Sequence, residues 1–435
     1  MKVNIISRKL VKPCTPTPPN LNKYKISLRD ELSPPININV ILFYPPNPNP
    51  KQTILSQLQE SLAKILPQFY PLAGRYIQKD HLVDCNDEGA EFVEAEATDI
   101  ELIDLIAKSK DDQLNDLLSR QIYDVDKSTD PLLSIQITNL KSGELAIGIS
   151  VSHRIFDASS LGTFIAAWSN ANHPRMGNTV IAPTFDSPSL FPGKNLGNHI
   201  QRPRSRDPNI VVKRLLFNKE DITNLRSKSK PSNNGEGAFI GRVRLVTALI
   251  AKALIGVELA KYGESRTCFV SQPVSMRERT IPPLPKHSCG NLSVVSAVRC
   301  LAANETKEIG LRQLVAIIGD AIDNTIKDIA QMLSLGEDGD KITLDAMMKM
   351  REKAASGEAS VLFFSDWSKF GFYEADFGWG KPIWAGIGSM PRQHATILID
   401  NKEGDGIEAW VHLNQNDVPY FERYLQLAEM ESEDY

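Results

Sequence analysis

Hydrophobic and polar residues alternate most regularly over residues 145–152, and this period of two predicts a β-strand. The odd-numbered positions carry leucine, isoleucine or valine, whereas the even-numbered positions carry only alanine, glycine and serine. Because small side chains leave room above a strand, we expect a ligand or a backbone segment to approach that second face.

A helical period follows this strand almost at once. Apolar residues recur at spacings of three and four from Leu161 to Trp168, which predicts a helix that faces the core. The same spacing predicts helices over 55–65 and 243–262. The polar, leucine-spaced segment 98–120 is also expected to be helical.

Further strands are expected over 40–44 and 211–217, with a strand pair over 81–95 whose turn is 86–89. The run 336–340 is rich in glycine and acidic residues and is expected to be a surface loop. Strands and helices alternate irregularly, which predicts an α/β or α+β fold.

The chain is long enough for two domains, since 435 residues exceed the usual size of one hydrophobic core. Apolar periodicity vanishes near 183–210, where five prolines stand among glycine, serine and asparagine. We therefore expect an N-terminal domain over 1–185, a proline-rich crossover linker over 186–210 and a C-terminal domain over 211–435.

The composition is that of a globular protein, with 42% hydrophobic and 23% charged residues and a net charge of −4. Charges of both signs are interspersed, which argues against a nucleic-acid or membrane partner. The first residues lack a secretory signal, and no run of about 18 apolar residues occurs. The five cysteines include no CxxC pair, so we expect reduced thiols in a cytoplasmic protein.

The segment 152–157, Ser-His-Arg-Ile-Phe-Asp, joins the predicted strand to the predicted helix. His153 is the candidate general base, because imidazole suits proton transfer near neutral pH and strand ends often hold catalytic groups. Asp157 directly precedes the helix and is a natural N-cap, so we do not assume that it orients His153.

A second motif, Asp376-Phe377-Gly378-Trp379-Gly380, places two glycines around a tryptophan. Such a string predicts a tight turn with a buried aromatic side chain. HRxxD followed by DFG superficially suggests a protein kinase, but the interval is too long, and no glycine-rich loop or VAIK lysine precedes it.

Other catalytic motifs are missing from the sequence. There is no GxSxG elbow, no HExxH and no GxxxxGK[ST]. These absences argue against an α/β-hydrolase, a metal-dependent hydrolase and nucleotide-phosphate chemistry, and we expect no metal site.

Segments spread over nearly the whole chain resemble the plant BAHD acyltransferases, which move an acyl group from coenzyme A to an alcohol or amine. The similarity is greatest to the branch that includes vinorine synthase and salutaridinol acetyltransferase, which act on plant alkaloids with acetyl-CoA. The segments are VKPCTPTPPNLNKYKISLRDEL, ILFYPP, FYPLAGR, SVSHRIFDASSLGTFIAAW, VSMRERTIPPLPKHSCGN, SDWSKFGFYEADFGWGKPIW and GDGIEAWVHL.

The resemblance implies an α/β, two-domain, chloramphenicol-acetyltransferase-like fold with a solvent tunnel between the domains. His153 matches the family's general base. Asp157 matches an aspartate that turns away from the tunnel and pairs with an arginine, for which Arg277 is the counterpart. The DFGWG string, 376–380, matches a structural brace near the coenzyme A end.

Two departures from the family pattern concern the reaction centre and the donor. Trp367 matches a tryptophan that lines the reaction centre, and its indole N–H is the candidate oxyanion donor. The family usually carries serine before this tryptophan, but Asp366 stands here, which leaves Ser365 as the neighbouring hydroxyl. HSCGN replaces the YFGNC string of the anthocyanin-malonylating branch at 287–291, so a malonyl donor is less expected.

The resemblance thus implies a monomeric acyl-CoA-dependent O-acyltransferase with no permanently bound cofactor. Acetyl-CoA is the expected co-substrate, and a hydroxyl of an alkaloid or terpenoid is the expected acceptor. Two alternatives stay open: a larger aromatic or aliphatic acyl donor or an amine acceptor, and a non-catalytic acyl-CoA- or metabolite-binding protein. Retention of His153 argues against the second.

Overall fold

The computed structural model describes residues 1–108, 111–125, 127–175, 181–196, 207–229, 239–263, 267–300 and 309–430. The chain divides into two compact units, each made of three segments. Unit 1 comprises Met1–Arg206, Pro285–Leu292 and Phe370–Pro391, and unit 2 comprises Asp207–Leu284, Ser293–Lys369 and Arg392–Tyr435.

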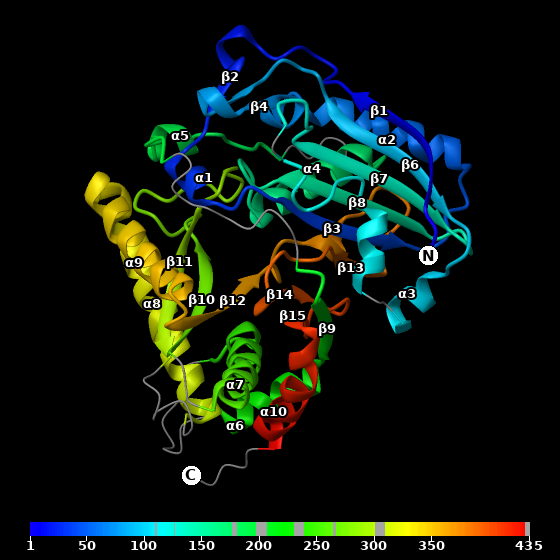
Figure 1. Cartoon of the computed structure of the whole chain (residues 1–435). Helices are drawn as coiled ribbons and strands as arrows, with labels where there is room; N and C mark the ends of the chain where they lie inside the picture. The colour runs from blue at the N-terminus through cyan, green and yellow to red at the C-terminus, as the bar shows by residue number, and fades with distance from the viewer. Residues whose placement is uncertain are drawn as a thin grey trace. The chain divides into compact units, whose positions relative to one another are not determined.

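Unit 1 contains a six-stranded sheet in which only β6 and β7 run parallel (Figure 1). Every residue of the interior strands β3 and β8 is buried, and the strands predicted over 40–44 and 145–152 are confirmed. In spatial order the strands are β1 (Asn4–Val11), β6 (Ala90–Ala97), β7 (Leu133–Leu140), β8 (Leu145–Ser152), β3 (Asn37–Tyr44) and β13 (Trp384–Ile387).

The small-residue face of β8 is approached by backbone. A methyl group added to Gly148 would lie 2.0 Å from the carbonyl oxygen of Leu117, at the end of the 3-10 helix η4 (Asp111–Leu117). On β7, the amide of Gln136 donates to the carbonyl oxygen of Asp116 over 2.9 Å. Of the two occupants expected above this face, a backbone segment is the one found at Gly148.

A smaller sheet in unit 1 has the order β2 (Lys23–Lys25), β5 (Leu82–Asp84), β4 (Arg75–Ile77). The predicted pairing within 81–95 is wrong, because β5 pairs with β2 and β4 whereas β6 pairs with β1 and β7. The chain turns at Gly89, whose φ is 101°, and passes from one sheet to the other.

Helices α2 (Lys51–Ile65) and α4 (Ala158–Asn172) pack against each other in unit 1 and confirm two predicted helices. The segment expected to be helical over 98–120 contains α3 (Leu102–Lys108) and the 3-10 helix η4, which confirm the expectation for those residues. The other helices in the described residues of this unit are short: η1 (Pro19–Leu21), α1 (Leu28–Leu32), η2 (Tyr70–Ala73), η3 (Gln78–Asp80), α5 (Ser187–Leu190) and η6 (Phe372–Glu374).

Unit 2 contains a second six-stranded sheet, in which β12 runs parallel to both of its neighbours. The strand predicted over 211–217 is confirmed as β9. In spatial order the strands are β11 (Ser293–Cys300), β10 (Thr267–Ser275), β12 (Ala359–Asp366), β14 (Ala395–Asp400), β15 (Ile407–Asn414) and β9 (Ile210–Phe217).

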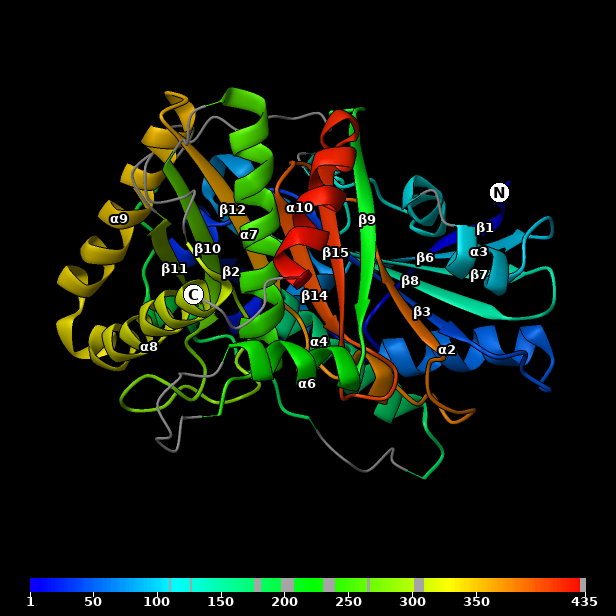
Figure 2. The same ribbon diagram turned by 90° about the horizontal axis from the view of Figure 1, so that it is seen from below.

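Helices α7 (Arg242–Tyr262) and α10 (Val418–Met430) cross the same face of the unit 2 sheet (Figure 2), and α7 confirms the helix predicted over 243–262. The two helices approach closely at Gly256, where an added methyl group would lie 2.3 Å from the ring of Tyr424. The other helices of this unit are α6 (Lys219–Lys228), α8 (Leu311–Leu335), α9 (Glu337–Ala355) and η7 (Gln415–Asp417).

The surface loop predicted over 336–340 is wrong. Helix α8 ends at Leu335 and α9 begins at Glu337, so Gly336 alone forms the turn, with φ of 53°. Asp340, expected at the surface, is buried within α9. A single glycine suffices here because it adopts the left-handed region at no steric cost.

The two units differ from the contiguous domains expected from the sequence. The boundaries 1–185 and 211–435 assign the segments Pro285–Leu292 and Phe370–Pro391 to the C-terminal domain, whereas both cluster with unit 1. Strand pairing explains the second assignment, since β13 hydrogen-bonds to β3. Of the expected linker 186–210, residues 197–206 lie outside the described part of the chain, and its first residues include α5.

No helix within the described ranges combines the length and the apolar character needed to cross a membrane.

Candidate active site

His153 lies in the turn that follows β8, in the strand-to-helix connection predicted for it. Its backbone N–H donates to the carbonyl oxygen of Ile36 over 2.8 Å. Its own carbonyl oxygen accepts from Nδ2 of Asn291, also over 2.8 Å. The side chain is half-buried. The backbone of His153 is therefore hydrogen-bonded through both its N–H and its C=O to groups of unit 1.

Asp157 is the N-cap of α4, as predicted from its position. Its Oδ1 accepts hydrogen bonds from the backbone N–H and the hydroxyl of Ser160, each over 2.8 Å. Its Oδ2 accepts from the backbone N–H of Leu292 over 3.2 Å. The carboxylate thus caps the helix and hydrogen-bonds the segment Pro285–Leu292 to the loop formed by residues 153–157.

The DFGWG string forms a turn in unit 1, and its two glycines have positive φ angles. Oδ1 of Asp376 accepts from the N–H groups of Gly378 and Gly380, over 2.7 and 2.9 Å. The φ angles of these glycines are 102° and 106°, a region that side chains disfavour. The turn chemistry predicted from the sequence is present.

Phe377 is the buried aromatic residue of this turn, with 1% of its surface exposed. Its ring meets Trp168 of α4 edge to face at a centroid distance of 4.8 Å and meets Tyr44 of β3 at 6.0 Å. Its carbonyl oxygen accepts from Nδ2 of Asn172 over 2.7 Å. The string therefore ties the last turn of α4 to the sheet.

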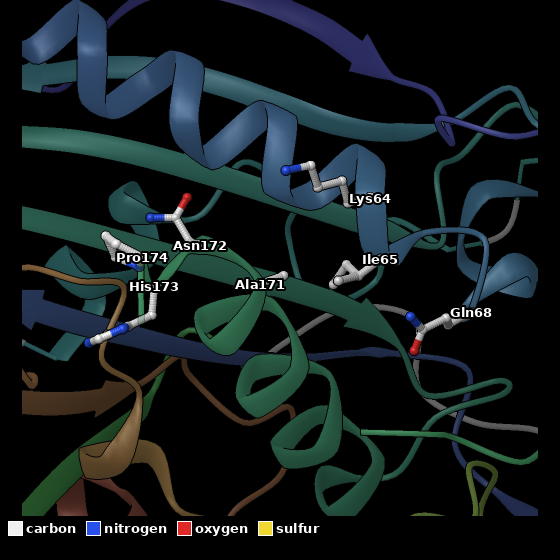
Figure 3. Close-up of a pocket in the computed structure, with 7 residues that line it drawn as sticks. All are labelled: Lys64, Ile65, Gln68, Ala171, Asn172, His173 and Pro174. Atoms are coloured by element: carbon white, nitrogen blue, oxygen red, sulfur yellow. The ribbon is translucent and has the colours of Figure 1, made fainter. Parts of the chain in front are cut away.

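A hollow of about 470 Å³ lies between the C-terminal ends of α2 and α4 (Figure 3). It adjoins the DFGWG turn, since Nε2 of His173 lies 4.0 Å from Oδ2 of Asp376. None of the predicted site residues lines it, and His153 is at the opposite end of α4, a helix about 22 Å long. The lining residues are Lys64, Ile65, Gln68, Ala171, Asn172, His173 and Pro174.

The other predicted site residues, Ser365, Trp367 and Arg277, belong to unit 2. Trp367 follows β12, is 7% exposed and donates its indole N–H to Oγ of Ser365 over 2.9 Å. Asp366 accepts from the backbone N–H of Ser368 over 2.9 Å, so its carboxylate closes a local turn. Arg277 is buried two residues beyond β10, and its pairing with Asp157 stays a prediction.

Two residues beside His153 were not predicted from the sequence. Asp30 of α1 is 4% exposed and Asn291 is 3% exposed. The Nδ2 of Asn291 that donates to His153 also donates to Oδ1 of Asp30 over 2.8 Å. A local signal existed: Ser27 and Asp30 form a capping box at α1, a pattern that is readable in the sequence.

The carboxyl of Asp30 is buried, with 4% of the residue's surface exposed. Burial raises the pKa of Asp30, and the hydrogen bonds from Ser27 and Asn291 oppose that rise. Burial likewise raises the pKa of Tyr24 well above its usual value, and the charge of Asp30 acts in the same direction. Both groups lie in the apolar interior of unit 1.

In the described ranges, no three His, Cys, Asp or Glu side chains are arranged to hold a metal ion. Of the cysteines, Cys14 is exposed, whereas Cys85, Cys268 and Cys289 are buried.

A family model described as the transferase family matches residues 1–427. The chain belongs to this family, the BAHD acyltransferases, as its motifs predicted. Its sequence is 43% identical over 432 residues to pelargonidin 3-O-(6-caffeoylglucoside) 5-O-(6-O-malonylglucoside) 4'''-malonyltransferase of Salvia splendens, with 98% of this chain and 99% of that one covered.

Vinorine synthase of Rauvolfia serpentina is 34% identical over 422 residues, with 95% of this chain and 94% of the relative covered. Its crystal structure matches this fold with a TM-score of 0.82 at 33% identity over 96% of each chain. Salutaridinol 7-O-acetyltransferase of Papaver somniferum is 31% identical over 469 residues, covering 97% of both chains. The predicted α/β, chloramphenicol-acetyltransferase-like fold is confirmed.

The relatives differ in the acyl group that their names specify, since one is a malonyltransferase and another an acetyltransferase. The family match establishes that this chain belongs to an acyl-CoA-dependent acyltransferase family. Because the relatives differ in the acyl group, the acetyl donor stays a prediction.

Proposed function

We propose that this protein transfers an acetyl group from acetyl-CoA to a hydroxyl group of a plant specialised metabolite, an alkaloid or a terpenoid, with His153 as general base. The observation that carries the proposal is the placement of His153. It stands in a strand-to-helix turn, is half-buried and has its peptide hydrogen-bonded on both sides. A side chain on such a fixed peptide suits a proton transfer that requires a defined geometry.

The reaction is a direct attack on the thioester within a ternary complex. The imidazole of His153 takes the proton as the acceptor oxygen attacks the thioester carbon, with a contribution of about 10²–10⁴ in rate. The C–O bond forms, the C–S bond breaks, and the proton passes to the coenzyme A thiolate. A thioester is already activated, so neither a covalent enzyme intermediate nor a metal is needed.

The oxyanion of the tetrahedral intermediate requires a hydrogen-bond donor. The indole N–H of Trp367 was the candidate from the sequence, but it donates to Oγ of Ser365. An oxygen that accepts a hydrogen bond directs its own proton elsewhere and becomes a better donor. We therefore assign the oxyanion contact to the Ser365 hydroxyl, with Trp367 as its support. Arg277 and the DFGWG string are assigned structural roles.

Malonyl transfer is the second candidate function. It is supported by the 43% identity to a relative whose name is that of a malonyltransferase. It is opposed by the HSCGN string at 287–291, which replaces the YFGNC string of the malonylating branch.

A donor comparison tests both candidates. The protein is incubated with acetyl-CoA or malonyl-CoA and a panel of alcohols, and the release of free thiol is followed. We expect thiol release with acetyl-CoA that depends on both the acceptor and His153. Turnover with malonyl-CoA alone would replace the first candidate by the second, and His153→Ala with wild-type turnover would refute the base.

The matched control is His81→Asn. His81 is a histidine of unit 1 with a φ of 49°, a backbone conformation that asparagine tolerates, and it lies outside the catalytic loop. We expect this variant to keep full turnover. His153→Ala should remain folded and still bind coenzyme A, since it removes a half-buried side chain and leaves the peptide contacts intact.

A further inference from the structure

We propose that Asp30 and Asn291 form a positioning pair that fixes the peptide of His153, and hence the direction of its imidazole. The proposal rests on the proposed function, because it gives the pair a role in catalysis only if His153 is the base. Neither side chain touches the reacting atoms in this scheme. Both act through His153.

The amide of Asn291 has a single possible orientation. It faces two groups that only accept hydrogen bonds, the carboxylate of Asp30 and the carbonyl oxygen of His153, each 2.8 Å away. Nδ2 carries two hydrogens and satisfies both, whereas the amide oxygen would repel both. The side chain therefore bridges a buried carboxylate to the catalytic peptide.

Asp30 is itself immobilised. Its Oδ2 accepts from the backbone N–H and the hydroxyl of Ser27, over 2.9 and 2.8 Å. Its Oδ1 accepts from both the backbone N–H and the amide of Asn291, over 3.2 and 2.8 Å. A carboxylate that is 4% exposed is costly to bury, and these contacts offset the cost only with all of the donors in place.

The same short segment holds both ends of the catalytic loop. Asn291 contacts His153, and the backbone N–H of the next residue, Leu292, contacts Asp157. The other side of the His153 peptide is fixed by the carbonyl oxygen of Ile36. Loss of the Asn291 donor would release the carbonyl of His153, so that the 153–154 peptide group could rotate while the N–H of His153 stays bonded to Ile36.

Displacement of a catalytic group by about 1 Å costs up to about 10²-fold in rate. We therefore expect Asn291→Ala and Asp30→Asn to lower kcat by about 10- to 100-fold, with the KM for the acyl-CoA nearly unchanged. Asp30→Asn keeps the shape of the side chain but replaces one carboxylate oxygen by an NH2 group. That group can only donate, and it would face the donors of either Ser27 or Asn291.

The matched control is Gln136→Ala. Gln136 is a buried amide of unit 1 that also makes two hydrogen bonds through one nitrogen, to Asp116 and Thr138. The Gln136→Ala protein should lose about as much thermal stability as the Asn291→Ala protein and keep the wild-type kcat. If Asn291→Ala melts like Gln136→Ala and also keeps wild-type kcat, the pair only stabilises the fold and the proposal is wrong.

A second readout is independent of turnover. The chain has seven histidines, so ¹⁵N-histidine labelling gives a short NMR spectrum in which the His153 signals are those missing from His153→Ala. We expect these signals to shift in Asn291→Ala and in Asp30→Asn but not in Gln136→Ala. Unchanged His153 signals in both variants would overturn the proposal. If Asn291→Ala does not fold, the His153 signals of Asp30→Asn alone test the proposal.

The two readouts also separate this proposal from the proposed function. If His153→Ala keeps its turnover while the His153 signals shift in the pair variants, the positioning contact exists and the base assignment fails. If His153→Ala is inactive while the pair variants keep both kcat and the His153 signals, the base stands and the positioning pair fails.

Discussion

The Oδ1 atom of Asp157 accepts a hydrogen bond from the backbone N–H of Ser160 over 2.8 Å, at the first turn of α4. This contact makes the second residue of the histidine–aspartate motif a helix cap. The motif's two residues therefore have separate roles, one in proton transfer by proposal and one in holding the loop.

Asp157→Ala is expected to destabilise unit 1. Loss of an N-cap typically costs about 0.5–2 kcal/mol, and the backbone N–H of Leu292 loses its acceptor as well. Asp157→Asn keeps an oxygen for Ser160 and should destabilise less. Thermal melting checks the order, and an inactive Asp157→Ala protein with an unchanged melting temperature would contradict the structural role.

The two glycines of the DFGWG string form a natural pair for a steric test. Both have φ angles above 100°, so alanine at either position costs about 1–3 kcal/mol in backbone strain. Only at Gly378 would the new methyl group also collide, 2.6 Å from Cδ of Pro174, whereas nothing lies within 4 Å at Gly380. We expect Gly378→Ala to unfold at lower denaturant concentration than Gly380→Ala. Equal midpoints would show that Pro174 moves freely aside.

Local pattern was sufficient to predict the elements whose hydrophobic period is set by how their own faces pack. Residues 145–152 alternate between large and small side chains because backbone at Leu117 closely approaches one face of β8 at Gly148. The spacing from Leu161 to Trp168 reflects the packing of α4 on α2. The cap at Asp157 was equally local, since it depends only on the residue before a helix. His153 was chosen as the candidate base partly in the same way, from its place between these two elements, and that role stays a prediction.

Pairing between distant segments was not predicted, because periodicity carries no information on which strand is the neighbour. The segments at 82–84 and 90–97 read as a hairpin, yet they join different sheets. For the same reason Asn291 was noted only as part of a string that bears on the donor. Its contact with His153, 138 residues away, depends on the return of Pro285–Leu292 to unit 1.

The contact between Ser365 and Trp367 predicts unequal effects of their substitution. The indole N–H donates to Oγ of Ser365, and by our proposal the hydroxyl proton then serves the oxyanion. Removal of an oxyanion donor costs about 10²–10³ in kcat, so we expect Ser365→Ala to fall in that range. Trp367→Phe removes only the supporting hydrogen bond and should cost less.

Steady-state kinetics decide between these roles. A larger loss of kcat in Trp367→Phe than in Ser365→Ala would indicate that the indole N–H, and not the Ser365 hydroxyl, is the oxyanion donor. Lys402→Ala serves as a control in unit 2, since this lysine is exposed in the turn between β14 and β15.

His394 is expected to make the stability of unit 2 depend on pH. It is 4% exposed, and its Nδ1 lies 3.7 Å from Oε1 of Glu258. Burial lowers the pKa of His394 below its usual value of about 6.5, and the positive charges of Lys261 and Arg392 act in the same direction. Glu258 and Asp417 oppose this shift without cancelling it.

The sign of the effect follows from proton linkage. Between the lowered pKa of folded His394 and about 6.5, the unfolded chain binds more protons at this site than the folded chain does, so the free energy of unfolding rises with pH. Stability from a neutral His394 is therefore present above about pH 6.5 and is lost as the pH falls. His394→Asn removes this titration and tolerates the φ of 58° found here.

Urea unfolding at a series of pH values from about 5 to 7.5 measures the effect. We expect the slope of unfolding free energy against pH to flatten in His394→Asn and to stay as in the wild type in His81→Asn. His81 also has a left-handed backbone but belongs to unit 1, whereas His394 and Glu258 belong to unit 2. An unchanged slope in His394→Asn would mean that the buried imidazole titrates at its ordinary pKa, with Glu258 compensating fully for burial.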